Sequence, residues 1–176
     1  MRRREFMGAA AGAAMTKTVL GANDRIGIGI IGCGQRGLLR EVLKFAHQTN
    51  VEVLAVCDTW RQQREKAGAA VQEASAKEPK AIVHYQDVLA MKEIDAVVIG
   101  TPDHQHCAQL TAAARAGKDA YVEKPLAMEM KELIEAVDTV KKHERVVQCG
   151  TQVRSFPTSA AGRAFVASGG LGKIFK

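Results

Sequence analysis

The sequence has few aromatic residues and no long run of charge of one sign. Aromatic side chains make up 5% of the 176 residues, and the formal net charge of +6 comes from 25 basic and 19 acidic residues. Half of the positive excess lies in residues 1–22, so the rest of the chain carries a weak excess among mixed charges. Nucleic-acid surfaces combine a basic patch with aromatic residues, so this composition argues against nucleic acid as a partner.

The sequence also lacks the spacing of a metal site. Its four cysteines are far apart and are best interpreted as small buried apolar side chains. They are Cys33, Cys57, Cys107 and Cys149. The pair His104 and His106 is a weak metal motif, because side chains two apart on a helix point in different directions and no third ligand is evident. We therefore predict no metal site.

No apolar run is long enough to form a membrane-spanning helix. Residues 1–22 instead resemble a twin-arginine (Tat) export signal. The pair Arg3-Arg4 stands two positions before Phe6, and the small-residue stretch 8–14 follows. We therefore expect an exported or periplasmic protein. The alternative is a cytoplasmic protein with an amphiphilic, unstructured N-terminus.

The most informative part of the sequence is a glycine-rich turn after an apolar segment. Residues 26–31 are rich in isoleucine and suit a central parallel strand. The turn that follows is Gly32-Cys33-Gly34-Gln35-Arg36-Gly37. In a dinucleotide site the first glycine allows the tight turn, the second lets the backbone approach a pyrophosphate, and the third lets the next helix lie close to the sheet. We expect this helix to begin near Gln35 and to direct its first N–H groups at the phosphates.

A carboxylate follows the next apolar segment. Asp58 comes directly after residues 51–57 and 21 residues after Gly37, close to the ~20 expected for an acid that accepts hydrogen bonds from ribose hydroxyls. Such an acid would repel a 2′-phosphate, which favours NAD as the cofactor. Arg61 and Arg64 follow and leave NADP open. The alternative is a turn without ligand, in which Asp58 caps the next helix.

Expected strands and helices alternate along the rest of the chain. Further strands are expected over residues 81–84, 94–100, 119–123 and 145–149, and helices over residues 60–76, 104–116, 130–143 and 157–168. This alternation predicts an α/β fold with a doubly wound parallel sheet, in which ligands bind at the carboxyl ends of the strands. We predict a leader over residues 1–22, a Rossmann domain over 23–152, and a connecting helix and first strand of a second domain over 153–176.

Two polar motifs follow later strands and so fall at the same edge of the sheet. Thr101-Pro102 precedes a helix whose first turn contains His106, where a polar group can contact the nicotinamide ribose or the pyrophosphate. Glu123-Lys124 precedes a proline, and a lysine ammonium there would stabilise alkoxide character during hydride loss. The structural alternatives are a helix N-terminus capped by the residue after Pro102 and a surface lysine beside a turn.

The last polar group follows the sixth expected strand. Gln152 and Arg154 are candidate substrate-side residues, and the alternative is a purely structural loop.

Together these motifs resemble the glucose–fructose oxidoreductase / inositol dehydrogenase (Gfo/Idh/MocA) family over roughly residues 24–176. The resemblance rests on the glycine turn, Asp58, the segment 101–106, Glu123-Lys124-Pro125 and the segment 150–154. It implies that Lys124 lies near the nicotinamide and the substrate. It also implies NAD(P)-dependent oxidation or reduction of a hydroxyl or carbonyl of a sugar, cyclitol or related molecule. A branch of the family carries Tat leaders.

The sequence departs from the family in its length. Relatives are about twice as long, and their second α/β domain supplies a histidine and an aspartate as acid and base and often the interface of a homo-oligomer. We therefore expect this chain to be a fragment that binds the cofactor and turns over poorly alone. Two alternatives are NAD-assisted glycoside cleavage, which leaves no net NADH, and a cofactor-binding module without catalysis.

Overall fold

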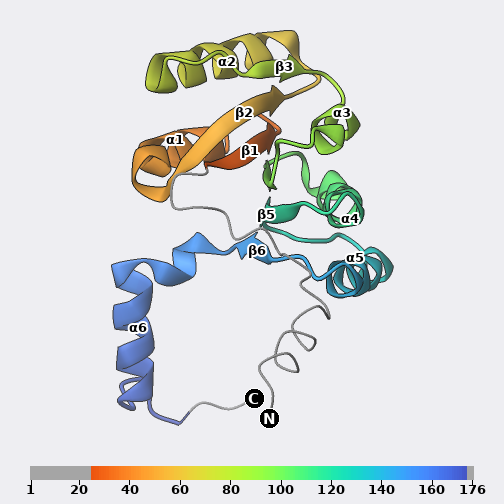
Figure 1. Cartoon of the computed structure of the whole chain (residues 1–176). Coiled ribbons are helices and arrows are strands. Elements are labelled where there is room, and N and C mark those ends of the chain that lie inside the picture. The colour runs from red at the N-terminus through yellow and green to blue at the C-terminus, as the bar shows by residue number, and fades with distance from the viewer. Residues whose placement is uncertain (1–24, 174–176) are drawn as a thin grey trace, which may run out of the picture.

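The computed structural model of the chain describes residues 25–173, which form a parallel sheet with helices on both faces (Figure 1). The strands are β1 (Ile26–Ile31), β2 (Val51–Cys57), β3 (Lys80–Ile82), β4 (Ala96–Ile99), β5 (Asp119–Glu123) and β6 (Val147–Gly150). The α-helices are α1 (Leu38–Thr49), α2 (Arg61–Ser75), α3 (Tyr85–Ala90), α4 (His106–Arg115), α5 (Met130–Lys142) and α6 (Pro157–Ala167).

The six strands are all parallel and lie in the order β3-β2-β1-β4-β5-β6. This confirms the predicted doubly wound sheet. The strand order reverses between β1 and β4, so the connections after these two strands leave toward opposite faces. A crevice forms at such a point, outside the carboxyl ends of the strands.

Adjacent residues of the central strands pack into two different cores. Ile30 contributes to the core beneath α1 and α2, and Ile31 to the core beneath α3, α4 and α5. Both side chains are buried, at 0% and 1% exposure, because a parallel strand with helices on both faces has no solvent side. Figure 1 shows the two helical layers on opposite sides of the sheet. Burial of each isoleucine contributes about 1.5–3 kcal/mol.

The turn after β1 differs in detail from its prediction. α1 begins at Leu38 and not near Gln35, because Gly37 has a left-handed backbone (φ 72°) at the N-cap. The prediction that Gly37 lets the helix lie close to the sheet is wrong, since a Cβ there would meet no atom nearer than 4.0 Å. The close approach is made by Gly32. A Cβ added there would lie 2.7 Å from the backbone of Gly100 and Thr101, which follow β4.

The C-terminal part of the described chain packs little. α6 contains no buried residue and stands apart from the sheet in Figure 1. Residues 170–173, predicted to begin the first strand of a second domain, form a turn and a bend instead. The rest of that predicted strand and the predicted leader over residues 1–22 lie outside the described residues. No helix within residues 25–173 has the length and apolar character to cross a membrane.

Candidate functional site

A cavity of about 940 Å³ opens at the carboxyl end of the sheet, where the connections after β1 and β4 leave toward opposite faces. Its size lies within the range of roughly 300–1,000 Å³ that is typical of small-molecule clefts. Seven of the predicted site residues line it. They are Gly32, Gly34, Gln35, Arg36, Asp58, Thr101 and Pro102. The other predicted residues do not line it. They are Cys33, Gly37, His106, Glu123, Lys124, Gln152 and Arg154.

Asp58 connects the end of β2 to the glycine turn. One carboxylate oxygen accepts a hydrogen bond from the backbone N–H of Cys33 at 2.9 Å, and the other accepts one from the N–H of Trp60 at 2.9 Å. The carboxylate therefore lies at the wall of the cavity beside the glycine turn. Each oxygen has a second lone pair with which a ligand hydroxyl can bond.

The two arginines that follow Asp58 are engaged in other contacts. Arg64 donates to the backbone oxygens of Asp58 at 2.6 Å and Thr59 at 3.1 Å. Arg61 forms an exposed ion pair with Glu65 at 3.6 Å on the same helix. Neither guanidinium lines the cavity.

The two thiols nearest the cavity are suppressed as nucleophiles. Burial raises the pKa of the Cys33 thiol to about 12, with a further contribution from the Asp58 carboxylate. Burial likewise raises the pKa of Cys57 to about 11. A thiol with such a pKa carries almost no thiolate at neutral pH. All four cysteines are free in this structure, as expected for small packing residues.

The loop after β4 is held by α4. The Thr101 hydroxyl donates to the side-chain oxygen of Gln109 at 2.7 Å. His106 is 1% exposed, and its two ring nitrogens lie 2.8 Å from the backbone oxygen of Thr101 and 2.6 Å from that of Pro125. Both nitrogens are thus engaged away from the cavity, so His106 connects two loops and does not present a polar atom to a cofactor.

Glu123 ends β5 as a buried carboxylate. It accepts hydrogen bonds from the Arg36 guanidinium, from the Gln152 side chain at 3.2 Å and from the N–H of Lys124 at 3.0 Å. Burial pushes the pKa of Glu123 up, but these hydrogen bonds outweigh burial, and its pKa lies below the usual range. Glu123 is therefore ionised at neutral pH.

Lys124 and Arg154 are exposed, and both follow carboxyl ends of strands. The Lys124 ammonium has no hydrogen-bond or ion-pair partner within the described part of the chain. Arg154 lies on the short 3₁₀ helix Gln152–Ser155, two residues after Gln152, whose side chain contacts Glu123. The Lys124–Pro125 peptide bond is cis. Within residues 25–173, His, Cys, Asp and Glu side chains form no cluster that could hold a metal.

Sequence reasoning missed several cavity residues beyond the glycine turn. Trp60, Gln63 and His84 line the cavity on the side of β2 and β3. Trp60 is 57% exposed, which is unusual for an indole with no polar role. Their position in the sequence could have indicated them, because they follow the carboxyl ends of β2 and β3. Thr101 was selected because it follows the carboxyl end of a strand, and the same reasoning applies to these residues.

The geometry of the cavity fits a dinucleotide. A Cβ at Gly34 would meet no atom within 4 Å, so the turn leaves open space beside its backbone. The N-terminus of α1 has no side-chain cap, so its first N–H groups are available to an anion. Asp58 lines the same cavity beside this turn.

Comparison with known proteins identifies curated relatives that are much longer than this chain. A glycosyl hydrolase family 109 protein of Shewanella sp. (strain W3-18-1) is 32% identical over 126 residues, which cover 69% of this chain and 27% of that protein. An alpha-N-acetylgalactosaminidase of Shewanella oneidensis is 32% identical over 124 residues, covering 67% and 26% respectively. The matched part of the chain thus spans about a quarter of the length of these relatives.

Among solved structures, scyllo-inositol dehydrogenase from Lactobacillus casei with bound NAD(H) and scyllo-inositol is similar in fold. The TM-score is 0.71 at 21% identity, and the match covers 86% of this chain and 43% of that one. The sequence profile described as "Oxidoreductase family, NAD-binding Rossmann fold" matches residues 26–151, which confirms the family predicted from the motifs. The chain therefore belongs to the GFO_IDH_MocA family of oxidoreductases with an NAD-binding Rossmann fold.

Proposed function

We propose that the chain binds NAD in the cavity at the carboxyl end of the sheet, for hydride transfer to or from a sugar, cyclitol or related hydroxyl or carbonyl compound. The observation that carries the proposal is the junction of the open glycine turn with Asp58 in one cavity. When bound, the nicotinamide supplies the group that accepts or delivers the hydride.

Residues of this chain supply binding and charge. The N-terminus of α1 and the backbone around Gly34 bind the pyrophosphate, and Asp58 accepts from the ribose hydroxyls. The unpartnered Lys124 ammonium stabilises negative charge that develops on the substrate oxygen. Arg154 binds polar groups on the substrate side.

NAD is favoured over NADP by the charge around the ribose. Asp58 presents a carboxylate where a 2′-phosphate would lie, and Arg64 is held by backbone oxygens at 2.6 and 3.1 Å. Neither of the two arginines after β2 therefore directs a cation at the position of a 2′-phosphate. NADP is the competing cofactor in the test below.

Calorimetric titration of the chain with NAD and NADP tests this proposal. We expect NAD to bind more tightly than NADP, and Asp58→Ala to weaken NAD binding about 100-fold, because hydrogen bonds to a charged group are lost. Asp58→Ala should also narrow the preference over NADP. Equal affinity of wild type and Asp58→Ala for NAD would contradict the assignment.

A second candidate function is NAD-assisted glycoside cleavage, which the names of the curated relatives favour. Oxidation of the sugar is transient in that reaction, so cleavage leaves no net NADH. Incubation with NAD and either a cyclitol or an aryl α-N-acetylgalactosaminide separates the two. Dehydrogenation gives one NADH per product, whereas cleavage releases the aryl alcohol without NADH.

We also propose that the protein is exported through the Tat route and, as a whole, assembles as a homo-oligomer. Arg3-Arg4 and Phe6 support the first part. Fusion of residues 1–24 to a Tat-dependent reporter should give periplasmic reporter, and Arg3→Lys with Arg4→Lys should retain it in the cytoplasm.

A further inference from the structure

Glu123 is a buried carboxylate with no direct role in the proposed hydride transfer. It is 1% exposed and does not line the cavity. Ionised carboxylates are disfavoured in such positions unless several donors surround them. Its retention in the ionised form therefore indicates a specific arrangement of donors.

The donors come from three loops that are distant in sequence. Arg36 belongs to the turn after β1, Lys124 to the loop after β5 and Gln152 to the loop after β6. One oxygen of Glu123 accepts from both Arg36 and the backbone N–H of Lys124. The glycine turn and the backbone of Lys124 are thus connected through a single atom.

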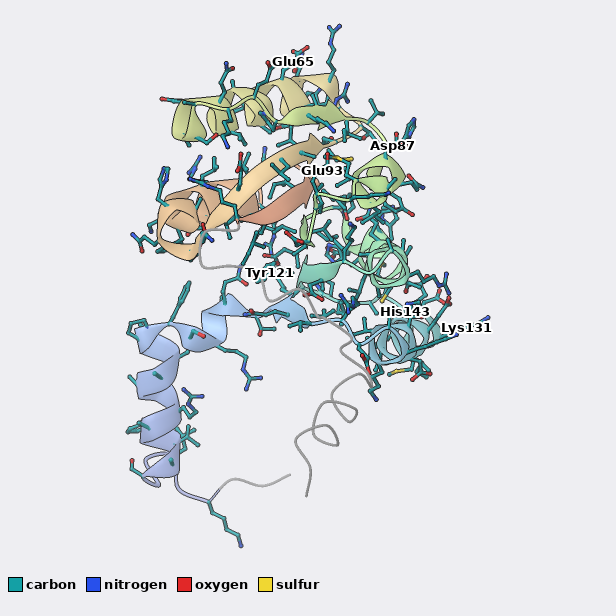
Figure 2. The ribbon with its side chains drawn as sticks, viewed as in Figure 1. Glu65, Asp87, Glu93, Tyr121, Lys131 and His143 are labelled. Atoms are coloured by element: carbon teal, nitrogen blue, oxygen red, sulfur yellow. The ribbon has the colours of Figure 1, made fainter. Side chains whose placement is uncertain are left out.

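The neighbouring strand is shaped to leave room for this carboxylate. A Cβ at Gly150 would lie 3.1 Å from the carboxyl carbon of Glu123 and 2.9 Å from the hydroxyl oxygen of Tyr121. That hydroxyl donates to Gln152 at 3.3 Å and so orients its amide toward Glu123. Figure 2 labels Tyr121 between the β1–α1 region and β6.

Arg36 belongs to both environments. Its side chain is 47% exposed and lines the cavity, while one of its nitrogens contacts the buried Glu123. The glycine turn, where the phosphates would bind, is therefore connected through Arg36 to the buried carboxylate.

We propose that Arg36 and Glu123 form a positioning pair that fixes Lys124 relative to the glycine turn, so that binding of the cofactor phosphates and placement of the nicotinamide are coupled. This inference rests on the proposed function, because it requires a dinucleotide that spans the turn and Lys124. Both residues act through others: Arg36 through Glu123, and Glu123 through the backbone of Lys124.

Two titrations of the 176-residue chain separate the two ends of the cofactor. ADP engages only the turn and Asp58, and its binding is followed by the fluorescence of Trp60, the single tryptophan. NADH also engages the nicotinamide end, whose emission reports its environment. In Glu123→Gln we expect NADH binding to weaken about tenfold and ADP binding to stay as in wild type.

Arg36 variants provide the matched controls. The dissociation constant of ADP divided by that of NADH should fall in Arg36→Met as it does in Glu123→Gln. It should fall no further in the double variant, because the same connection is lost in each case. Arg36→Lys, which keeps a cation, should restore part of the ratio. Exchange of the Lys124 amide hydrogen should become faster in Arg36→Met even without cofactor.

Equal weakening of ADP and NADH in Glu123→Gln, together with a lower unfolding temperature, would reduce the pair to a structural role and overturn the proposal. Unchanged NADH binding, or an unchanged Lys124 amide exchange rate in Arg36→Met, would overturn it as well. A wild-type chain that binds neither ligand would instead contradict the proposed function, and the coupling with it.

Discussion

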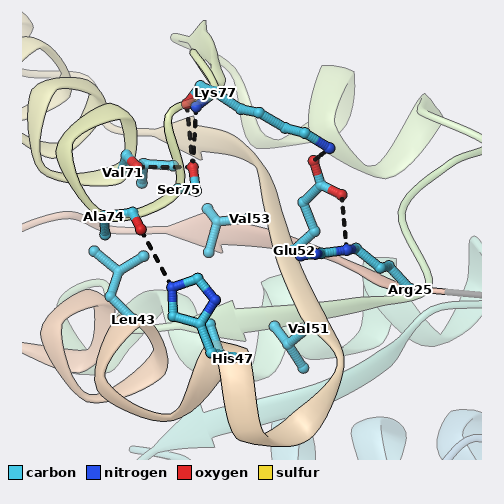
Figure 3. A pocket seen from close by; sticks show the side chains of 11 residues that line it. Arg25, Leu43, His47, Val51, Glu52, Val53, Val71, Ala74, Ser75 and Lys77 are labelled. Carbon is cyan, nitrogen blue, oxygen red and sulfur yellow. Dashed lines mark hydrogen bonds and ion pairs between the residues drawn. The ribbon is translucent and has the colours of Figure 1, made fainter. Parts of the chain in front are cut away.

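A second, smaller cavity of about 70 Å³ lies at the amino end of the sheet, opposite the candidate site. Figure 3 shows its polar residues turned toward one another, with Glu52 between Lys77 at 2.6 Å and Arg25 at 3.9 Å. His47 lies 3.3 Å from the backbone oxygen of Ala74. The charged groups at this end of the sheet pair with one another.

The carboxyl end carries similar residue types in a different arrangement. The cavity at this end is more than ten times larger than the one at the amino end. Asp58 lines it, and each of its carboxylate oxygens keeps a lone pair that can accept a further hydrogen bond. Two buried side chains here are His106 and Glu123, and each connects loops that follow different strands. Residue type alone therefore does not mark a site; the end of the sheet and the open space do.

Matched histidines give the largest expected difference in stability. His106→Leu should lower the free energy of unfolding by about 3 kcal/mol, because two backbone oxygens lose their buried partner. The exposed His47→Leu should change it by less than about 0.5 kcal/mol. Urea unfolding of both variants measures this, and equal losses would erase the distinction between the two ends.

Matched glycines separate packing from binding. Gly150→Ala places a Cβ against Tyr121 and Glu123 and should cost about 1–3 kcal/mol of stability. Gly34→Ala meets open space, so its stability should stay near that of wild type. Its NAD affinity should nevertheless fall, since the Cβ enters the space of the pyrophosphate. Thermal unfolding and calorimetry report the two effects, and normal NAD binding by Gly34→Ala would remove the turn from the site.

Two glutamates are expected to contribute differently to the stability of the folded chain. The pKa of Glu123 is lowered from 4.5 in the folded chain, so its contribution to stability is present above pH 4.5 and is lost as pH falls through the folded pKa. Glu123→Gln should therefore flatten the acid limb of the stability curve. Glu52→Gln, with half-exposed partners, should alter stability by at most about 1 kcal/mol. An acid limb unchanged in Glu123→Gln would refute the claimed hydrogen bonding.

Exposed aromatic residues give the smallest expected effect. Trp60→Ala should weaken NAD binding about fivefold, because an indole at the cavity wall packs against the cofactor. Phe45→Ala removes a ring of 46% exposure outside the cavity and should leave NAD binding unchanged. Calorimetry distinguishes the two, and equal affinities would indicate that Trp60 does not contact the ligand.

The sequence was sufficient for the fold and for the cavity's centre, because both depend on local patterns. Ile26–Ile31, the glycine turn and Asp58 lie within about 30 residues and follow known spacing. It was insufficient for Gly37, whose backbone conformation depends on the turn. The Glu123 connections also escaped it, because Arg36 and Gln152 reach that carboxylate from 87 and 29 residues away.

Hydrogen–deuterium exchange with and without NAD decides at which end of the sheet the cofactor binds, since it reports both ends at once. We expect added protection in residues 32–37, 58–60 and 101–105, and unchanged exchange in residues 43–53 and 71–77 around the small cavity. Protection confined to the amino end, or absent throughout at saturating NAD, would contradict it.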